Sequence, residues 1–418
     1  MMEYGCIGEK LGHSFSKIIH EALFPYKYDL CELSFDEVAP FMEAKAFRAI
    51  NVTIPYKETV IPFLDYIDPK AQKIGAVNTV VNRDGKLYGY NTDFFGMRGL
   101  FRKNGISLSG RKVLVLGTGG TSKTAREVAR DGGAREIIAV SRRKSAGTVT
   151  YDEAVSLHND AEIIINTTPV GMFPKIGESA IALTPFSSLC GVVDAVYNPL
   201  RSALVTEAKK RGIPAVGGLY MLISQAVFAA ERFINATVDE REVEKLFHSL
   251  TKDKENIVLT GMPGCGKSTV GREIARALSM DFVDTDDEIV KDAGMSIPEI
   301  FEREGEKAFR DRETAAIKRV SALQHTVIAT GGGAVLREEN VDLLKENGRI
   351  YFIDRPFEFL VTSSDRPLSS DREMLKKRLD ERYDIYCARC DKRIEASQEL
   401  KLNVETIIKD FNDEDFSN

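Results

Sequence analysis

The sequence predicts an α/β protein with more than one parallel-sheet domain, and three observations carry this prediction. The 418 residues exceed the roughly 100–200 residues of one ordinary domain, and 43% of them are hydrophobic. Short β-rich runs alternate with helical or loop segments between residues 112 and 228, which is typical of a parallel sheet covered by helices. A new strand begins at residue 256, and a second α/β pattern follows it to the end of the sequence.

The elements expected along the chain define the domain boundaries. Residues 1–100 mix strands and helices, with strands over 49–54 and 76–81. Four strands follow at 112–117, 136–140, 161–166 and 191–196, and two helices at 220–235 and 239–250. The domains predicted are 1–100 completed by helices at about 229–250, then 101–228, a polar linker at 251–255, and 256–418.

Composition argues against several classes of partner. The net charge is −6 and the pI about 5.7, so no basic excess indicates nucleic acid or an anionic membrane. No apolar run approaches the roughly 20 residues of a membrane helix, and Met-Met-Glu-Tyr-Gly is not a signal pattern. Six cysteines form no pairing framework, and the CxxC of Cys387 and Cys390 has no second pair nearby. We therefore expect a cytoplasmic protein, with zinc disfavoured.

A phosphate-binding loop is the strongest local motif. Gly261-Met262-Pro263-Gly264-Cys265-Gly266-Lys267-Ser268 matches G-x-x-x-x-G-K-[ST] between a strand and a helix-like run. Its backbone N–H groups can surround phosphates, Lys267 can neutralise them, and Ser268 can hold Mg²⁺.

Four further features follow this loop. Asp284 and Asp286 come just after a second strand, and Arg310 lies near acidic residues. The glycine run 331–333 follows another strand, where backbone can press close to a small molecule. Arg366-Pro367-Leu368 lies in a polar stretch suited to a closing lid. Read alone, Asp284 also fits a helix cap.

In this order, with Arg382-x-x-x-Tyr386 last, the motifs resemble shikimate kinase over nearly all of residues 251–418. The resemblance implies a sheet with helices on both faces, as in nucleoside monophosphate kinases. The residues implied to bind ATP are Gly264, Cys265, Gly266, Lys267, Ser268, Thr269 and Arg366, with Ser268 and Asp284 serving Mg²⁺. Asp286 is implied to hold the shikimate hydroxyl and act as base, Arg310 and Arg382 to clamp the carboxylate, and Gly332 to donate a backbone N–H.

One departure accompanies this resemblance. Relatives often carry another arginine several residues before R-P-L, whereas residues 359–365 contain none, and the segment is short. Arg382, read alone, also fits a surface helix charge.

A second glycine turn lies in the first half. Gly117-Thr118-Gly119-Gly120 follows a strand and precedes a helix, the context of a dinucleotide turn, although Ser122 occupies the third glycine position. The next strand ends in Ser141-Arg142-Arg143, without the acid that suits NAD. Two arginines there favour the 2′-phosphate of NADP, the alternative being a solvated charge pair.

Small polar motifs precede this turn. Lys57 ends the run Asn51-Val52-Thr53-Ile54-Pro55-Tyr56-Lys57, and Asp93 ends Gly89-Tyr90-Asn91-Thr92-Asp93. Hydride transfer to a ketone needs a proton donor beside the developing alkoxide, and Lys57 with Asp93 is a plausible pair. In isolation, Lys57 would be read as an exposed lysine.

Taken together, the motifs of residues 1–248 resemble shikimate dehydrogenase, including N-T-T-P-V-G-M at 166–172 and G-L-Y-M-L-x-x-Q at 218–225. The resemblance implies a substrate-binding domain, a Rossmann-like NADP domain, and Lys57 as catalytic residue with Asp93 as its partner. The residues implied to bind the substrate are Ser14, Ser16, Thr53, Asn78, Asp93, Tyr197 and Gln225. Those implied to bind NADP are Gly117, Thr118, Gly119, Gly120, Thr121, Ser141, Arg142, Arg143, Thr167, Ala195 and Gly218.

This half also departs from its relatives. They usually have S-P at Ser16-Lys17, G-A-G-G-A at the glycine turn, and N-R-T at Ser141-Arg142-Arg143. These differences concern cofactor affinity more than reaction type.

The two resemblances imply consecutive reactions. NADPH-dependent reduction of 3-dehydroshikimate would yield shikimate, and ATP would phosphorylate it to shikimate 3-phosphate. Two alternatives stay open: a kinase-like half that binds nucleotide without turnover, and a first half acting on quinate with NAD. The sequence leaves the oligomeric state open.

Overall fold

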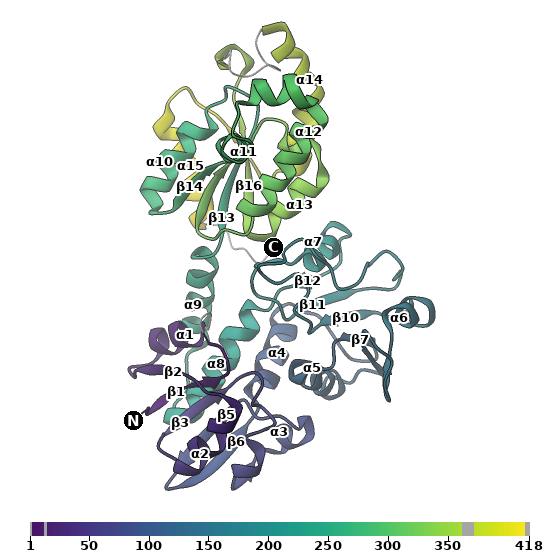
Figure 1. The fold of residues 1–418 in the computed structure, drawn as a ribbon, viewed down its shortest axis with the longest axis vertical. Coiled ribbons are helices and arrows are strands. Elements are labelled where there is room, and N and C mark those ends of the chain that lie inside the picture. The colour runs from purple at the N-terminus through teal and green to yellow at the C-terminus, as the bar shows by residue number, and fades with distance from the viewer. Residues whose placement is uncertain (1, 12–14, 362–371, 414–418) are drawn as a thin grey trace. The chain divides into compact units, whose positions relative to one another are not determined.

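The computed structural model describes residues 2–11, 15–361 and 372–413. The chain divides into two compact units (Figure 1). Unit 1 comprises Met1–Val170, Ser179–Asn198 and Glu207–Ser249, and unit 2 comprises Gly171–Glu178, Pro199–Thr206 and Leu250–Asn418. The α/β prediction is confirmed, because helices accompany three sheets in which parallel strand pairs predominate.

The first sheet of unit 1 is mixed. Its order is β2 (Tyr28–Glu32), β1 (Tyr4–Gly8), β3 (Ala49–Val52), β5 (Thr79–Arg83), β6 (Lys86–Tyr90) and β4 (Tyr66–Ile67), with β5 antiparallel to both β3 and β6. The helices here are α1 (Ser16–Leu23), α2 (Phe35–Ala44), η1 (Ile61–Phe63), α3 (Pro69–Ile74) and α4 (Thr92–Lys103). The strand expected over 76–81 begins at Thr79, because Val77 N–H donates to the Lys57 carbonyl in a loop.

The second sheet of unit 1 is parallel throughout. Its order is β12 (Ala215–Val216), β11 (Gly191–Asp194), β10 (Ile163–Asn166), β7 (Lys112–Leu116), β8 (Glu136–Val140) and β9 (Thr148–Val149). The helices of this part of the sequence are α5 (Gly120–Asp131), α6 (Tyr151–Leu157), α7 (Ala203–Lys210), α8 (Leu219–Ile234) and α9 (Glu240–Lys252). Residues 203–206 of α7 and 250–252 of α9 belong to unit 2, and α8 packs against α4 and α1. In α8, Ala229 and Phe233 join a buried cluster with Tyr4 and Tyr28 of the first sheet.

The sheet of unit 2 is also parallel. Its order is β14 (Asp281–Asp284), β15 (Thr326–Ala329), β13 (Asn256–Thr260), β16 (Gly348–Asp354) and β17 (Lys392–Glu395). Its helices are α10 (Lys267–Leu278), α11 (Thr285–Ala293), α12 (Ile297–Val320), η2 (Ala334–Leu336), α13 (Glu338–Asn347), η3 (Phe357–Phe359), α14 (Arg372–Arg389) and α15 (Leu400–Asp413). The segment expected as linker, 251–255, begins inside α9, which extends to Lys252.

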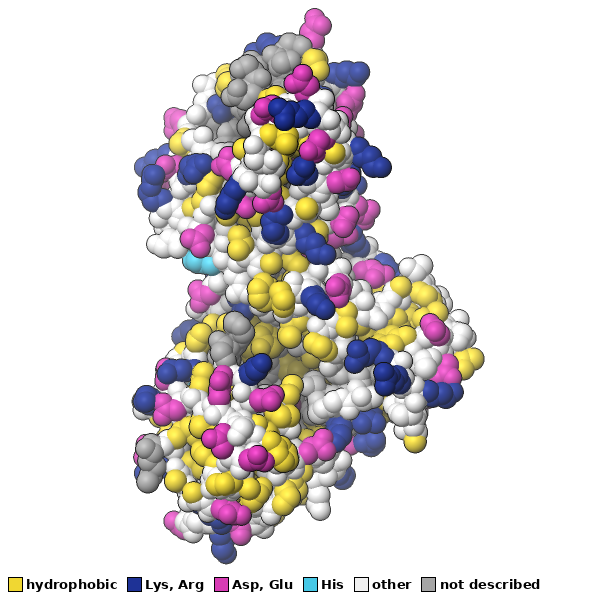
Figure 2. Space-filling view, in the orientation of Figure 1, with side chains coloured by type: hydrophobic (Ala, Val, Ile, Leu, Met, Phe, Trp, Pro, Cys, Tyr) yellow, Lys and Arg dark blue, Asp and Glu magenta, His cyan; other side chains and the backbone are white. Residues whose placement is uncertain are grey.

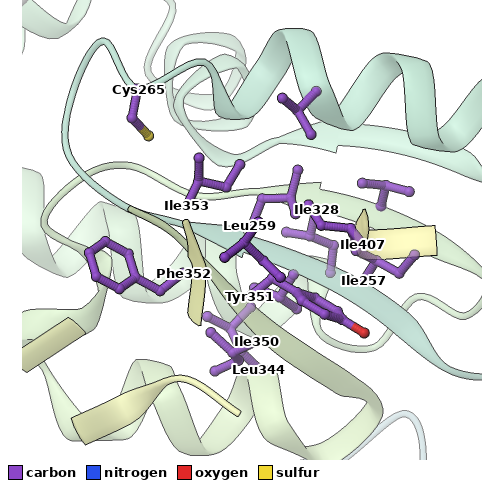
Figure 3. Close-up of a cluster of buried hydrophobic side chains, with 14 of the residues drawn as sticks. Ile257, Leu259, Cys265, Ile328, Leu344, Ile350, Tyr351, Phe352, Ile353 and Ile407 are labelled. Atoms are coloured by element: carbon purple, nitrogen blue, oxygen red, sulfur yellow. The ribbon is translucent and has the colours of Figure 1, made fainter. Parts of the chain in front are cut away.

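The core of unit 2 places the phosphate loop on a rigid base. Figure 3 shows apolar side chains of β13, β15 and β16 packed with Leu344 of α13 and Ile407 of α15. The β13 residues Ile257 and Leu259 are fully buried, as a central strand covered on both faces requires. The loop that follows β13 is therefore anchored at its start. None of the helices in the described ranges has the length and apolar character that crossing a membrane demands.

Candidate functional site

Lys57 and Asp93 form an ion pair in unit 1. Lys57 Nζ lies 2.6 Å from Asp93 Oδ2, and the side chains are only 17% and 11% exposed. Asp93 stands in the first turn of α4, whose N-cap Asn91 accepts from Phe94 N–H. The structure therefore brings together the lysine and the carboxylate that the sequence paired.

A buried hydrogen-bond network orients the polar side chains beside this pair. Asn78 is 3% exposed, and its Oδ1 accepts from Thr92 N–H at 2.7 Å. Thr79 Oγ1 lies 3.1 Å from both Asn78 Oδ1 and Thr92 Oγ1. Because Oδ1 accepts several bonds, the amide orientation of Asn78 is set, which leaves its NH₂ group to face outward from the network.

The remaining expected substrate residues come from separated segments. Ser16 begins α1, and Thr53 follows β3 with its N–H donating to the Ile7 carbonyl. Tyr197 follows β11 and meets the ring of Phe15 edge-on at 5.8 Å. Gln225 packs close to Gly96, one turn beyond Asp93 in α4. Ser14 lies outside the described residues.

The glycine turn after β7 lies next to Lys57. Gly117 has φ 107°, a conformation that favours glycine. A β-carbon on Gly117 would lie 2.8 Å from Thr167 Oγ1, and one on Gly120 would lie 3.8 Å from Lys57 Cδ. Thr118, Gly119 and Thr121 complete the turn into α5. Ser122 is fully buried and donates from Oγ to the Gly117 carbonyl, which accounts for a serine at the third glycine position.

The end of β8 presents two exposed arginines. Ser141 Oγ donates to the Arg143 carbonyl and accepts from Arg143 N–H, which forms a local turn. Arg142 and Arg143 are exposed. Elsewhere along the same sheet edge, Gly218 approaches Ala195 so closely that a β-carbon there would lie 2.3 Å from the Ala195 carbonyl oxygen. The expected cofactor residues thus follow the carboxyl ends of successive parallel strands. These ends form the sheet edge where such folds bind dinucleotides.

Unit 2 contains a cavity of about 360 Å³ beside the phosphate loop. Among the residues that the structure describes, those of the expected kinase motifs that line it are Gly264, Gly266, Lys267, Ser268, Thr269, Asp284, Asp286, Arg310, Gly331, Gly332, Gly333 and Arg382. Arg366 lies outside the described residues, and Cys265 is buried beneath the loop. Segments distant in sequence therefore meet in one cavity.

The phosphate loop has the conformation expected of an anion cradle. Gly261, Gly264 and Gly266 have positive φ angles, and Gly266 caps α10. Lys267 is 7% exposed, and its Nζ donates to the Gly261 and Met262 carbonyls at 2.9 and 3.0 Å. The ammonium is thereby held over the loop whose N–H groups surround the same space.

Asp284 accepts a hydrogen bond through each of its two carboxylate oxygens. Its Oδ2 accepts from Ser268 Oγ at 2.6 Å, and its Oδ1 accepts from Asp286 N–H at 3.0 Å as the N-cap of α11. The helix-cap reading is thus correct and also compatible with metal binding. Asp286 faces the cavity, where a β-carbon on Gly331 would lie 2.8 Å from its Oδ1.

Arg310 is held by two acids, the buried Glu313 and the exposed Glu306. Its Nη1 lies 2.8 Å from Glu313 Oε2, and its Nη2 lies 3.3 Å from Glu306 Oε1. Burial alone would lower the arginine pKa, but Glu313 and Glu306 raise it above its usual value. A β-carbon on Gly333 would collide with the guanidinium, only 2.1 Å from Nη1, so this glycine makes room for the arginine.

Arg382 is a buried cavity residue rather than a surface charge. It is 7% exposed, and its Nη1 donates to the Gly332 carbonyl at 3.1 Å, which Tyr386 Oη also engages. These bonds involve the Gly332 carbonyl, whereas the family resemblance assigns a role to the Gly332 N–H.

Sequence reasoning missed two arginines in this cavity, Arg378 and Arg355. Arg378 lies one helical turn before Arg382 on α14, so the i,i+4 spacing was the available signal. Burial, and then the positive charge of Arg382, lower the Arg378 pKa. Arg355 follows β16, and no motif marks it.

Comparisons with known proteins match both parts of the chain. The family profile "Shikimate dehydrogenase substrate binding domain" matches residues 6–80, and the profile "Shikimate kinase" matches residues 263–412. A shikimate dehydrogenase (NADP(+)) of Clostridium perfringens (strain SM101 / Type A) is 35% identical over 268 residues, covering 60% of this chain and 98% of the relative. That of Halothermothrix orenii is 38% identical, covering 54% and 88%.

Solved structures resemble the first part of the chain. Shikimate dehydrogenase 1 from Peptoclostridium difficile has a TM-score of 0.55 at 33% identity, covering 60% of this chain and 98% of that one. A chorismate mutase/shikimate 5-dehydrogenase fusion protein from Clostridium acetobutylicum has a TM-score of 0.56 at 36% identity, covering 60% and 97%. Shikimate 5-dehydrogenase from Thermus thermophilus, in complex with NADP(H) and shikimate, has a TM-score of 0.54 at 28% identity, covering 60% and 99%.

Proposed function

Because the chain belongs to the shikimate dehydrogenase family over its first part and carries a shikimate kinase domain in residues 263–412, we propose that it catalyses both reactions. It would reduce 3-dehydroshikimate with NADPH and phosphorylate shikimate with ATP. The observation that carries this proposal is the pairing of the expected reactive groups in each unit. Lys57 pairs with Asp93 at 2.6 Å, and Asp286 shares a cavity with Lys267.

When bound, NADPH would supply the hydride for the reduction. Lys57 Nζ donates a proton to the oxygen that becomes negative as the ketone accepts the hydride. Asp93 holds the ammonium in place and, through its charge, keeps the lysine oriented when the site is closed to water. Asn78 and Gln225 supply amide groups for ring hydroxyls. Ser16 supplies a hydroxyl for the carboxylate.

The choice of NADP rests on the end of β8. Arg142 and Arg143 are exposed there and can form charge-assisted hydrogen bonds with a 2′-phosphate. No acid occupies the Ser141–Arg143 segment to accept bonds from an unphosphorylated ribose. The position of Ser122 leaves the turn geometry intact, so the departure from G-x-G-x-x-G does not argue against a dinucleotide.

In the phosphorylation, Asp286 accepts the proton of the attacking hydroxyl, while Lys267 and the loop N–H groups stabilise charge on the phosphoryl oxygens. Arg310 and Arg382 bind the carboxylate of shikimate, which fixes the ring relative to Asp286. Arg310 is prepared for this role because Glu313 and Glu306 hold its guanidinium in one position beside Gly333.

Mg²⁺ fits the oxygen donors next to the loop. Ser268 Oγ and Asp284 Oδ2 lie 2.6 Å apart, and Mg²⁺ is usually held by one or two carboxylates together with water and substrate phosphates. A site made of protein ligands alone is therefore not needed for Mg²⁺. The described residues contain no group of three or more His, Cys, Asp or Glu side chains suited to a metal. When bound, the metal would balance phosphate charge, with Ser268 and Asp284 positioning it.

One incubation tests both halves. The whole purified protein receives 3-dehydroshikimate, NADPH, ATP and Mg²⁺, and the products are identified by mass. We expect shikimate 3-phosphate. Asp286→Asn should stop at shikimate, and Lys57→Met should make neither product from 3-dehydroshikimate but should still phosphorylate added shikimate. Failure of the unmodified protein to phosphorylate added shikimate would refute turnover by the kinase half and leave a nucleotide-binding module.

A further inference from the structure

We propose that Arg355 is a nucleotide-binding residue of unit 2 that contacts the phosphates of ATP held by the loop Gly261–Ser268. This inference deepens the proposed kinase function and rests on it for the identity of the nucleotide. The sequence motifs assign no role to Arg355.

The sheet topology brings Arg355 to the loop. It directly follows β16 (Gly348–Asp354), which lies parallel to β13 with Phe352 opposite Thr260. The phosphate loop directly follows β13. Because the carboxyl ends of neighbouring parallel strands share one sheet edge, the arginine and the loop emerge together.

The side chain reaches into the cavity at the glycine that begins α10. Arg355 lines the cavity with Gly264, Gly266 and Lys267. A β-carbon on Gly266 would lie 3.5 Å from Arg355 Nη1, so the guanidinium is within contact distance of the loop backbone. Gly266 N-caps α10, where backbone N–H groups and the helix dipole favour an anion.

The buried Nε of Arg355 has no hydrogen-bond partner within the described ranges. The neighbouring carboxylate of Asp354 faces other groups, accepting from Arg393 at 2.8 Å and from Tyr383 Oη at 3.0 Å. A buried, unsatisfied donor is costly, and a phosphate oxygen would satisfy it.

The other cavity arginines argue for phosphate rather than the shikimate carboxylate as the ligand of Arg355. Arg310 and Arg382 surround the glycine run, and Arg378 is close enough to Arg382 that this positive charge helps to lower the Arg378 pKa. These three form one group of cations. Arg355 instead lines the part of the cavity next to the phosphate loop and Lys267, where the triphosphate is expected.

The test is a binding titration on the full-length protein. Fluorescent mant-ATP is titrated in the presence of saturating NADP⁺, which occupies the dehydrogenase site, and is displaced by ATP, ADP or AMP. Arg355→Met should weaken ATP and ADP binding by about 10-fold or more, the loss expected for one charge-assisted hydrogen bond. It should weaken AMP less and leave the KM for shikimate within about twofold. Arg355→Lys should recover part of the affinity, because it restores the charge without the planar fork.

Arg276→Met is the matched control, because Arg276 lies on α10 with its side chain 75% exposed and paired to Glu273. It should bind every nucleotide as the unmodified protein does. A change of less than about twofold for ATP in Arg355→Met would overturn the proposal, as would an equal loss for AMP and ATP. If Arg355→Met weakens ATP while even the unmodified protein fails to phosphorylate shikimate, the nucleotide contact stands and the proposed turnover fails.

Discussion

At the scale of single residues, Lys57 and Arg310 are each fixed by an opposite charge and lie beside a glycine. Lys57 pairs with Asp93 and lies beside Gly120, and Arg310 pairs with Glu313 where a β-carbon on Gly333 would collide. The pairing removes rotamer freedom before the substrate binds, and at Gly333 the missing β-carbon leaves space for the Arg310 guanidinium.

Lys57→Met should slow the turnover of the dehydrogenase reaction by about 10²–10⁴-fold, the usual contribution of a positioned proton donor. Methionine keeps the apolar stem of the lysine but cannot donate a proton. Oxidation of NADPH, followed by its ultraviolet absorbance, measures the loss, and ATP-dependent phosphorylation of added shikimate in the same preparation should be unchanged. Loss of both activities would indicate misfolding rather than a missing donor.

Arg378→Met should raise the KM for shikimate in the kinase reaction by about 10-fold and leave the KM for ATP nearly unchanged. Arg378 lines the cavity one turn before Arg382, and the two positive charges together favour a carboxylate. Lys377→Met is the matched control, since Lys377 is 79% exposed and pairs with Glu381. A higher KM for ATP in Arg378→Met would assign the residue to the nucleotide instead.

At the scale of elements, both sites form where parallel strands end. The loop after β13, the cap after β14 and the glycines after β15 share one edge in unit 2, as the turn after β7 and the arginines after β8 do in unit 1. This arrangement follows from strand direction alone. It explains how motifs separated by many residues converge.

The sequence predicted the elements that carry strong local signals. The strand at 136–140 matches β8, and the helix at 220–235 differs from α8 by one residue at each end. The phosphate loop could also be predicted because its motif is specific, and the Lys57–Asp93 pair because its motifs occur together with the others of residues 1–248. Arg355 could not, because its role depends on β16 lying next to β13, a pairing that no local pattern encodes.

The α1–β2 region should lose stability as the pH falls below about 6.5, the ordinary histidine pKa. His20 of α1 is 1% exposed and stacks on Tyr28 of β2 at 4.2 Å, and burial lowers its pKa to about 3. Between these values the unfolded state binds a proton that the folded state does not. The free energy of unfolding therefore has its full value above the pKa of His20 in the unfolded state. Below that pKa it declines by about 1.4 kcal/mol per pH unit.

Hydrogen exchange of peptides covering residues 16–32, measured from about pH 7.5 to about pH 5 and corrected for intrinsic rates, checks this expectation. His20→Gln cannot gain the proton, so its protection should depend less on pH, whereas His158→Gln, at a partly buried position elsewhere in unit 1, should behave like the unmodified protein. Equal pH dependence in His20→Gln and the unmodified protein would contradict the assignment.

At the scale of the whole molecule, each unit holds a site of its own. Basic and acidic side chains are interspersed over the face that Figure 2 draws. Tethering raises the local concentration of one site near the other, but a small molecule released into solvent diffuses away quickly. We therefore expect the two activities to be coupled by proximity without channelling.

A mixture of two full-length variants tests this expectation without cutting the chain. Asp286→Asn can only reduce and Lys57→Met can only phosphorylate, so in an equimolar mixture every shikimate molecule must pass through solvent. At equal concentrations of active sites, the lag before shikimate 3-phosphate forms from 3-dehydroshikimate should be the same in the mixture and in the unmodified protein. The shared lag follows from the time needed to raise free shikimate to the KM of the kinase site. A shorter lag in the unmodified protein, persisting when each single activity has been matched, would show direct transfer and refute free diffusion.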